Sequence, residues 1–250
     1  MYKGFYNLTS AMLTHGRNLN VISNNMANVS TSGFKADTFT ATTFDDVMWT
    51  RVGNKDKQYV DLGNQSYITA PSQLYTDYSQ EGFDVTGNAL DFAIEGEGYF
   101  AVQTEDGETY YTRAGNFTLD DEGYLTLPGV GQVLDNEGTP VFLMTDKIEA
   151  STDGTLNSQY GDFLARIGVY TFGEDAAPEK NAMGLFDAPG DPQLAENVRV
   201  HHGMVERANV DWVQQMTRMI SAQRAYQSAA QMSKIYDDVM GKSASDLGRM

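Results

Sequence analysis

An apolar side chain recurs every three or four residues through the first thirty residues of the chain. The eight positions that share this spacing are Phe5, Leu8, Met12, His15, Leu19, Ile22, Met26 and Val29. They follow the a and d positions of four heptads, and only His15 among them is polar. An isolated helix of this length is marginal in water, so its apolar face requires a partner. The partner is either the core of its own domain or another helix.

A second helical pattern occupies the last forty residues. Its seven-residue series are Trp212, Met219, Tyr226, Ser233 and Met240, with Gln215, Ala222, Ala229 and Tyr236 between them. Either Asn209 or Asp211 can cap the start of this helix. We expect the two terminal helices to pack together through close contacts at alanines. They either form a closed hairpin or bury their remaining faces against neighbouring subunits, and we favour the second because a two-helix pair has little core.

The stretch between these helices has the pattern of an antiparallel β domain. Short apolar runs are separated by turn signals at Asp106-Gly107, Asp120 to Gly123, Asn136 to Gly138 and Asp153-Gly154. The fold class is therefore α+β. We predict an N-terminal coiled-coil helix over 1–33, an extended connector over 34–80, a central, mainly antiparallel β domain over 81–202, and a C-terminal coiled-coil helix over 203–250. Asparagines at 24, 25 and 28 predict that the first helix ends there.

Composition and charge exclude several classes of function. The 250 residues include no cysteine, which excludes disulfides and thiol catalysis, and no apolar run of 18 residues, so we expect no membrane insertion. The net charge of −17 argues against nucleic acid as a partner. Residues 1–36 carry three bases and no acid, residues 203–250 carry six bases and five acids, and the middle carries the other 29 acids. The near-neutral ends can therefore pack against copies of themselves.

No arrangement of residues predicts catalysis, a cofactor or a metal. Gly96-Glu97-Gly98 is followed by strand residues instead of a helix, unlike a dinucleotide-binding loop. Asp120 to Gly123 lacks the ligand spacing of a calcium loop, and a turn is the better interpretation. Three histidines, of which His201 and His202 are adjacent, offer no general base for a triad. An acidic carboxylate pair acting on cell-wall carbohydrate is the remaining enzymatic or sugar-binding alternative.

Four separated blocks of sequence resemble the bacterial flagellar rod and hook protein family. They are residues 21–35 (VISNNMANVSTSGFK), residues 80–82 with 86–100 (QEG and TGNALDFAIEGEGYF), residues 111–117 (YTRAGNF), and residues 209–211 with 219–227 (NVD and MISAQRAYQ). The blocks span nearly the whole chain in the family's order. One departure is Glu206-Arg207-Ala208-Asn209, where the family has a serine before the asparagine, which affects the details of the helix start.

The resemblance implies a structural subunit of the flagellar basal-body rod, the drive shaft that transmits torque to the hook. It implies that the terminal helices form a coiled coil lining a tubular polymer, with other rod subunits as partners. It also implies export by the flagellar type III apparatus without a cleaved signal, to a position outside the cytoplasmic membrane. The C-terminal residues are most similar to those of proximal rod subunits, and a distal rod or hook-type subunit is the alternative.

We therefore expect the site of this protein to be an assembly interface on its terminal helices. The residues predicted to form it are Phe5, Leu8, Met12, Leu19, Ile22, Asn25, Met26, Asn28, Val29, Trp212, Met219, Ala222, Tyr226, Ala229, Tyr236 and Met240.

Overall fold

The chain folds into two compact units. The computed structural model describes residues 2–43, 47–52, 59–65, 69–173, 178–181, 183–188, 190, 192–195 and 198–247. The helical unit comprises Met1–Ala27, Asp37–Asp77 and Val210–Met250, and the β unit comprises Asn28–Ala36 and Tyr78–Asn209. Parts of the predicted connector (44–46, 53–58 and 66–68) and the last three residues of the predicted C-terminal helix lie outside the described residues.

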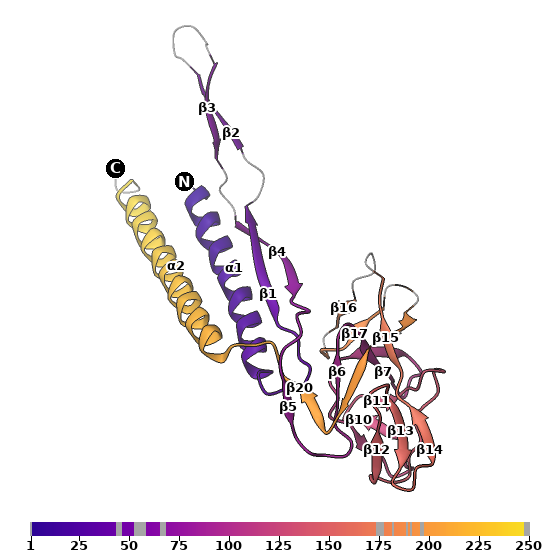
Figure 1. The fold of residues 1–250 in the computed structure, drawn as a ribbon. Helices are drawn as coiled ribbons and strands as arrows, with labels where there is room; N and C mark the ends of the chain where they lie inside the picture. Colours follow the sequence, from indigo (N-terminus) through magenta and orange to yellow (C-terminus); the bar gives the residue numbers. More distant parts are fainter. Residues whose placement is uncertain are drawn as a thin grey trace. The chain divides into compact units, whose positions relative to one another are not determined.

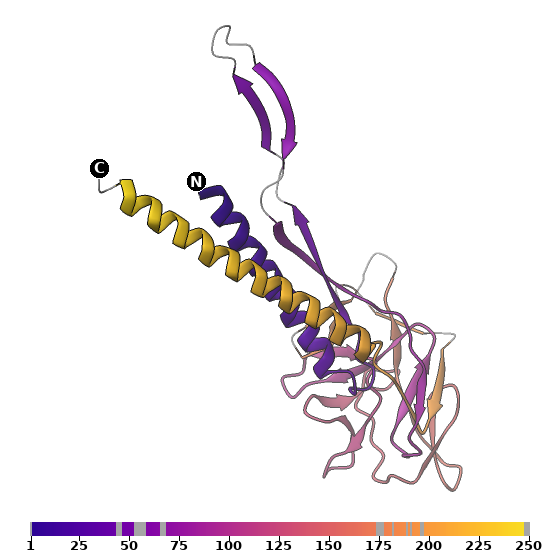
Figure 2. The same cartoon turned by 90° about the vertical axis from the view of Figure 1, so that its left-hand side faces the viewer.

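Two long helices run side by side in opposite directions in the helical unit (Figures 1 and 2). They are α1 (Tyr2–Ala27) and α2 (Trp212–Leu247). Gly4 lies against the ring of Tyr236 and Gly16 lies against that of Tyr226, which fixes the antiparallel order. Asp211, one of the two predicted caps, caps α2. Its Oδ1 accepts from the backbone N–H groups of Val213 and Gln214, at 2.9 and 3.0 Å.

Two antiparallel strand pairs complete the helical unit, within the segment predicted to be an extended connector. Strand β1 (Asp37–Thr43) pairs with β4 (Thr69–Thr76), and β2 (Val47–Val52) pairs with β3 (Tyr59–Gln65). The β1–β4 register shifts between Phe39 and Ala41. Both β1 and β4 pack against α1, so the segment that follows the first helix returns along it.

The β unit is built from short antiparallel strands. Nine form one sheet, in the order β16 (Glu179–Lys180), β17 (Phe186–Asp187), β8 (Thr109–Thr112), β7 (Tyr99–Gln103), β11 (Gly131–Val133), β10 (Leu125–Leu127) and β9 (Thr118–Leu119), with β15 (Val169–Thr171) on β7 and β18 (Gln193–Leu194) on β15. Three more form the sheet β12 (Ile148–Ala150), β13 (Thr155–Ser158) and β14 (Phe163–Arg166). The pairs β19 (Arg199–His202) with β6 (Phe92–Glu95) and β20 (Met204–Glu206) with β5 (Phe83–Val85) lie beside them.

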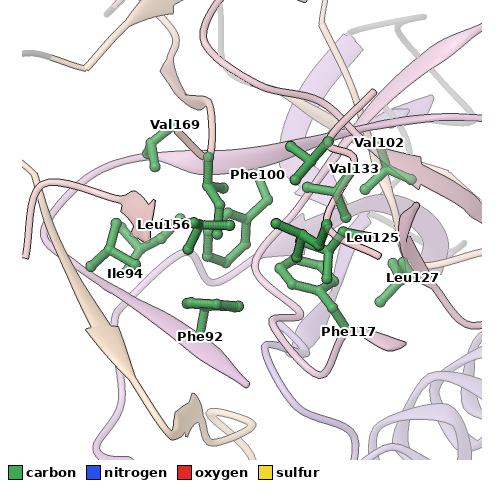
Figure 3. Packing of buried hydrophobic residues seen from close by; sticks show 14 of the residues in the cluster. Phe92, Ile94, Phe100, Val102, Phe117, Leu125, Leu127, Val133, Leu156 and Val169 are labelled. Carbon is green, nitrogen blue, oxygen red and sulfur yellow. The ribbon is translucent and has the colours of Figure 1, made fainter. Parts of the chain in front are cut away.

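Side chains from several of these strands meet in one apolar core (Figure 3). The ring of Phe117 contacts those of Phe92 and Phe100, with centroids 6.1 and 5.2 Å apart. Leu125 and Leu156 are fully buried beside them. The core draws on residues from β6 to β19, so this unit holds a complete hydrophobic core of its own.

The four predicted turns are all present and share one geometry. Gly107, Gly123, Gly138 and Gly154 each have a φ between 79° and 92° and donate the backbone N–H to the carbonyl three residues earlier. Glycine suits these positions because a positive φ carries no steric penalty without a Cβ. The α+β class predicted from the sequence is confirmed, with one helix near each end and an antiparallel β region between them.

Gly115→Ala is expected to lower the free energy of unfolding of the β unit by roughly 3 kcal/mol or more. An added Cβ would lie 1.7 Å from the carbonyl oxygen of Phe92, and the Phe92 N–H donates to the Gly115 carbonyl at 2.9 Å. Gly173→Ala is the control, because a Cβ there meets nothing within 4 Å. Urea unfolding followed by near-UV circular dichroism measures both variants, and equal midpoints would contradict the packing described.

Candidate assembly surface on the terminal helices

The face that α2 turns toward α1 is lined with small residues. Ala222 and Ala229 are buried there, as is Ile22 on α1. Gln215 and Thr14 are buried polar members of the same unit. Alanines allow the two helix backbones to approach closely, so the seam between the helices is narrow.

The predicted interface residues fall into three groups by exposure. Those buried within the chain are Ile22, Asn25, Ala222 and Ala229. Those half-buried are Leu8, Met12, Leu19, Met26, Asn28, Val29, Met219, Tyr236 and Met240. Those exposed are Phe5, Trp212 and Tyr226. Asn28 and Val29 belong to the β unit, and the other fourteen belong to the helical unit.

Asn25 joins the end of α1 to the start of β1. Its Nδ2 donates to the carbonyl of Asp37 at 2.7 Å, and its Oδ1 accepts from the Asp37 N–H at 3.1 Å. Helix α1 ends at Ala27, inside the predicted range, but Asn25 bonds a residue twelve positions away instead of the local helix end. The amide therefore fixes β1 on the helix with its hydrogen-bonding groups satisfied.

Large apolar side chains remain exposed on both helices. On α1 these are Phe5, Tyr6 and Leu13, and on α2 they are Trp212, Val213, Met216, Ile220, Tyr226, Met232, Ile235 and Val239. Large apolar side chains exposed in this number are typical of interaction surfaces. None of the described residues outside the helices covers them, so a single chain leaves these side chains in water.

A groove opens between α1, β1 and α2. Its volume is about 330 Å³, and its walls include Val21 and Ile22 of α1, Phe39 of β1, and Gln215, Arg218 and Ala222 of α2. Oε1 of the buried Gln215 has no hydrogen-bond partner. Most of the residues that line the groove are polar, among them Asn18, Asp37 and Ser221, and the groove carries one unsatisfied acceptor.

A buried ion cluster in the β unit holds the two segments that lead into the helices. Glu206 accepts from Lys35 Nζ through Oε1 at 2.6 Å and from Arg113 Nη1 through Oε2 at 3.3 Å. The exposed fractions of Lys35, Arg113 and Glu206 are 1%, 5% and 0%. Lys35 also donates to the Ser79 carbonyl, and Arg113 Nη2 donates to that of Gly96. We call these three side chains the anchor cluster.

Backbone hydrogen bonds reinforce the anchor cluster. The N–H of Gly33 donates to the carbonyl of Glu206 at 2.8 Å, and the N–H of Asn209 donates to the carbonyl of Phe34 at 3.3 Å. Asn209, the alternative predicted cap, instead accepts from the Ala36 N–H at 2.6 Å through its side chain. The chain that leaves α1 and the chain that enters α2 are therefore tied together over a few residues.

The stability of the β unit is expected to fall above pH 10 because of Tyr99. Burial raises the pKa of Tyr99 to about 12, although the Arg113 guanidinium over its ring, 5.0 Å from the centroid, acts in the opposite direction. The unfolded chain has a tyrosine pKa near 10, so its ionisation favours unfolding once pH exceeds that value. This contribution is fully present below pH 10 and is lost as pH rises toward 12, by roughly 1.4 kcal/mol per pH unit.

Urea unfolding at pH 8, 10 and 11 measures this effect. Tyr99→Phe is expected to reduce the slope of stability against pH above 10, while Tyr110, Tyr111 and Tyr170, whose pKa values are also raised, maintain a residual slope. An unchanged slope in Tyr99→Phe would contradict this assignment.

The sequence did not reveal the anchor cluster or the bridging role of Asn25. Lys35 and Arg113 lie in two of the blocks that resemble the family, and Glu206 lies where the sequence departs from the family pattern. These positions were the one signal in the sequence that could have pointed to the anchor cluster. The described part of the chain holds no group of three or more histidine, aspartate or glutamate side chains placed to bind a metal. Neither described helix is long and apolar enough to cross a membrane.

Three family models match the chain in sequence order. Residues 5–35 match "Flagella basal body rod protein", residues 93–158 match "Flagellar hook protein FlgE/F/G D1 domain", and residues 201–247 match "Flagellar basal body rod FlgEFG protein C-terminal". The outer two matches cover most of α1 and all of α2. The middle one covers much of the apolar core of the β unit.

Similar proteins cover the chain almost from end to end. The flagellar basal-body rod protein FlgG of Bacillus subtilis is 30% identical over 96% of this chain and 97% of its own length. The flagellar basal-body rod protein FlgF of Caulobacter vibrioides is 29% identical over 96% of each. FlgF of Mesorhizobium japonicum is 31% identical over 94% of this chain and 93% of its own length.

Proposed function

This chain belongs to the flagellar basal-body rod protein family, and from that membership we propose that it is a structural subunit of the bacterial flagellar rod. The observation that carries the proposal is the set of large exposed apolar side chains on both terminal helices of a chain whose β unit has a complete core of its own. Similarity along nearly the full length of named rod proteins supports a role for the whole chain. The proposal assigns the chain no catalytic step.

The subunits polymerise through their terminal helices. Burial of the exposed side chains of α1 and α2 removes apolar area from water, which is the main driving force for association. In the polymer, the helix pair extends into a coiled coil shared with neighbouring copies and with other axial proteins. The resulting tube is the drive shaft that transmits torque to the hook.

The flagellar type III apparatus exports the subunit without removal of a signal peptide, and the subunit is placed outside the cytoplasmic membrane. Its position is the proximal rod, with a distal rod or hook-type position as the alternative. The similarity of its C-terminal residues to proximal subunits supports this choice. Locating a labelled copy in purified basal bodies, near the cell or near the hook, distinguishes the two positions.

Hydrogen exchange on the dilute, purified chain tests the assembly-dependent part of the proposal. We expect strong protection within residues 84–200 and little within 1–30 and 210–240. The reason is that the β unit has its own core, whereas the helices bury one narrow seam in a single chain.

The same measurement on assembled rods is expected to show protection of both terminal segments. Strong protection of both termini in the dilute monomer would contradict the proposal that their burial depends on neighbours.

A further inference from the structure

The groove between α1, β1 and α2 contains an acceptor that the chain itself does not satisfy. Gln215 is 5% exposed, lines the groove, and leaves Oε1 without a partner. A buried, unpaired side-chain oxygen is uncommon in folded proteins. Val21, Ile22 and Phe39 form an apolar part of the lining beside it, among polar side chains such as Asn18 and Arg218. A donor accompanied by apolar side chains would complete the groove.

An apolar ridge with a donor lies on the other side of α2. Val213, Met216 and Ile220 are 71%, 49% and 44% exposed, and their spacing places them on one helix face. We call these three residues the ridge. Trp212 stands beside them, 48% exposed. Its indole N–H is a donor only, and none of the described residues accepts from it. Trp212 therefore offers a donor for Gln215 Oε1, and the ridge offers apolar side chains for the apolar part of the groove.

The ridge and the groove lie at the same level of α2 on roughly opposite faces. At 3.6 residues per turn, Gln215, Arg218 and Ala222 point about half a turn away from the ridge. Figure 2 shows α2 as one continuous helix through this region. One copy cannot place its ridge in its own groove, but it can place it in the groove of the next copy.

We propose that the ridge of one subunit inserts into the groove of the adjacent copy, with Trp212 Nε1 donating to the Gln215 Oε1 of that copy. The proposal rests on the proposed function, and it names the surfaces that meet. Each subunit gives its ridge to one neighbour and its groove to another. Such a head-to-tail contact generates a ring or an open helical array instead of a closed dimer.

The chain contains no cysteine, so engineered cysteines can report this contact without background. The test variant is Ser221→Cys with Gln223→Cys. Ser221 lines the groove, and Gln223 follows the ridge residue Met216 by seven positions on the same face. The two cysteines point away from each other within one chain, so disulfides form only between copies. Basal bodies carrying the variant are purified, oxidised and separated without reductant.

We expect a ladder of covalent dimers, trimers and larger species. The matched control is Ser221→Cys with Ser228→Cys, which places both thiols on the groove side, two turns apart, and is expected to remain monomeric. Incorporation without a ladder would overturn the proposed contact and leave the rod function standing. Absence of the wild-type chain from basal bodies would instead overturn the rod function.

A second pair of variants tests the proposed contact if the cysteine variant is not incorporated into basal bodies. Ser221→Trp fills the groove, whereas Ser228→Trp adds the same side chain outside it. We expect Ser221→Trp to reduce incorporation into basal bodies by roughly tenfold or more and Ser228→Trp to leave it near the wild-type level. Equal incorporation or equal loss of the two variants would overturn the proposal.

Discussion

Glu206→Gln is expected to lower the free energy of unfolding of the β unit by roughly 3–5 kcal/mol. The glutamate is fully buried and faces both Lys35 and Arg113, at 2.6 and 3.3 Å. The neutral glutamine keeps the size of the side chain but leaves two buried cations without their shared counter-charge. Desolvation of a charge is offset only by a well-placed partner, so the loss is much larger than for a surface pair.

The natural control is Glu95→Gln. Glu95 pairs with His201 at 2.9 Å, but their side chains are 47% and 31% exposed, so we expect a change of about 1 kcal/mol or less. Both tryptophans, Trp49 and Trp212, belong to the helical unit, whereas tyrosines lie in both units, so unfolding of the β unit is followed by near-UV circular dichroism of tyrosine and not by tryptophan fluorescence. Equal unfolding midpoints for the two variants would show that the anchor cluster contributes nothing.

Ile22→Asp and Leu19→Asp are expected to abolish rod assembly and swimming while the β unit stays folded. Ile22 is 4% exposed and lines the groove, and Leu19 is half-buried on the same helix. A carboxylate at either position would be buried without a partner, and the penalty exceeds what one apolar seam supplies. Because Ile22 is more buried than Leu19, its variant is expected to be the more severe.

Swimming in soft agar and incorporation into basal bodies measure the result, with urea unfolding as the check on the β unit. Two controls change one negative charge outside the seam. Asn20→Asp adds a carboxylate on the exposed face of α1, and Asp121→Asn removes one from an exposed turn. Normal motility of both seam variants would contradict assembly through the terminal helices.

The sequence predicted the elements that depend on local chemistry. The heptad spacing identified both helices, Asp211 was one of two predicted caps, and the glycines at 107, 123, 138 and 154 marked turns that are all present. These signals are strong because each depends on a few consecutive residues. The α+β class followed from the switch between a helical period and turn-bounded apolar runs.

The sequence did not predict which side of the second helix is buried most deeply. Gln215, Ala222 and Ala229 form the buried series, whereas Trp212 and Tyr226 of the other series are exposed. Seven residues fall about 20° short of two full turns, so an apolar series drifts around a straight helix. Spacing alone therefore identifies a face only approximately, and tertiary contacts with α1 and β1 decide the rest.

Long-range polar contacts were also beyond sequence reasoning. Lys35 and Glu206 are 171 positions apart, and each could equally have been a solvated surface charge. Asn25 was typical of a helix end, yet it bonds the backbone of Asp37. Such pairings depend on how elements meet in space, which no local pattern encodes.

An image reconstruction of the intact flagellar rod, with this chain identified by a bound label, would show whether the chain is a rod subunit. We expect the label to mark a subunit of the rod wall whose terminal helices pack against those of neighbouring subunits. A label absent from the rod, or a rod in which the terminal helices of this chain contact no neighbour, would contradict this expectation.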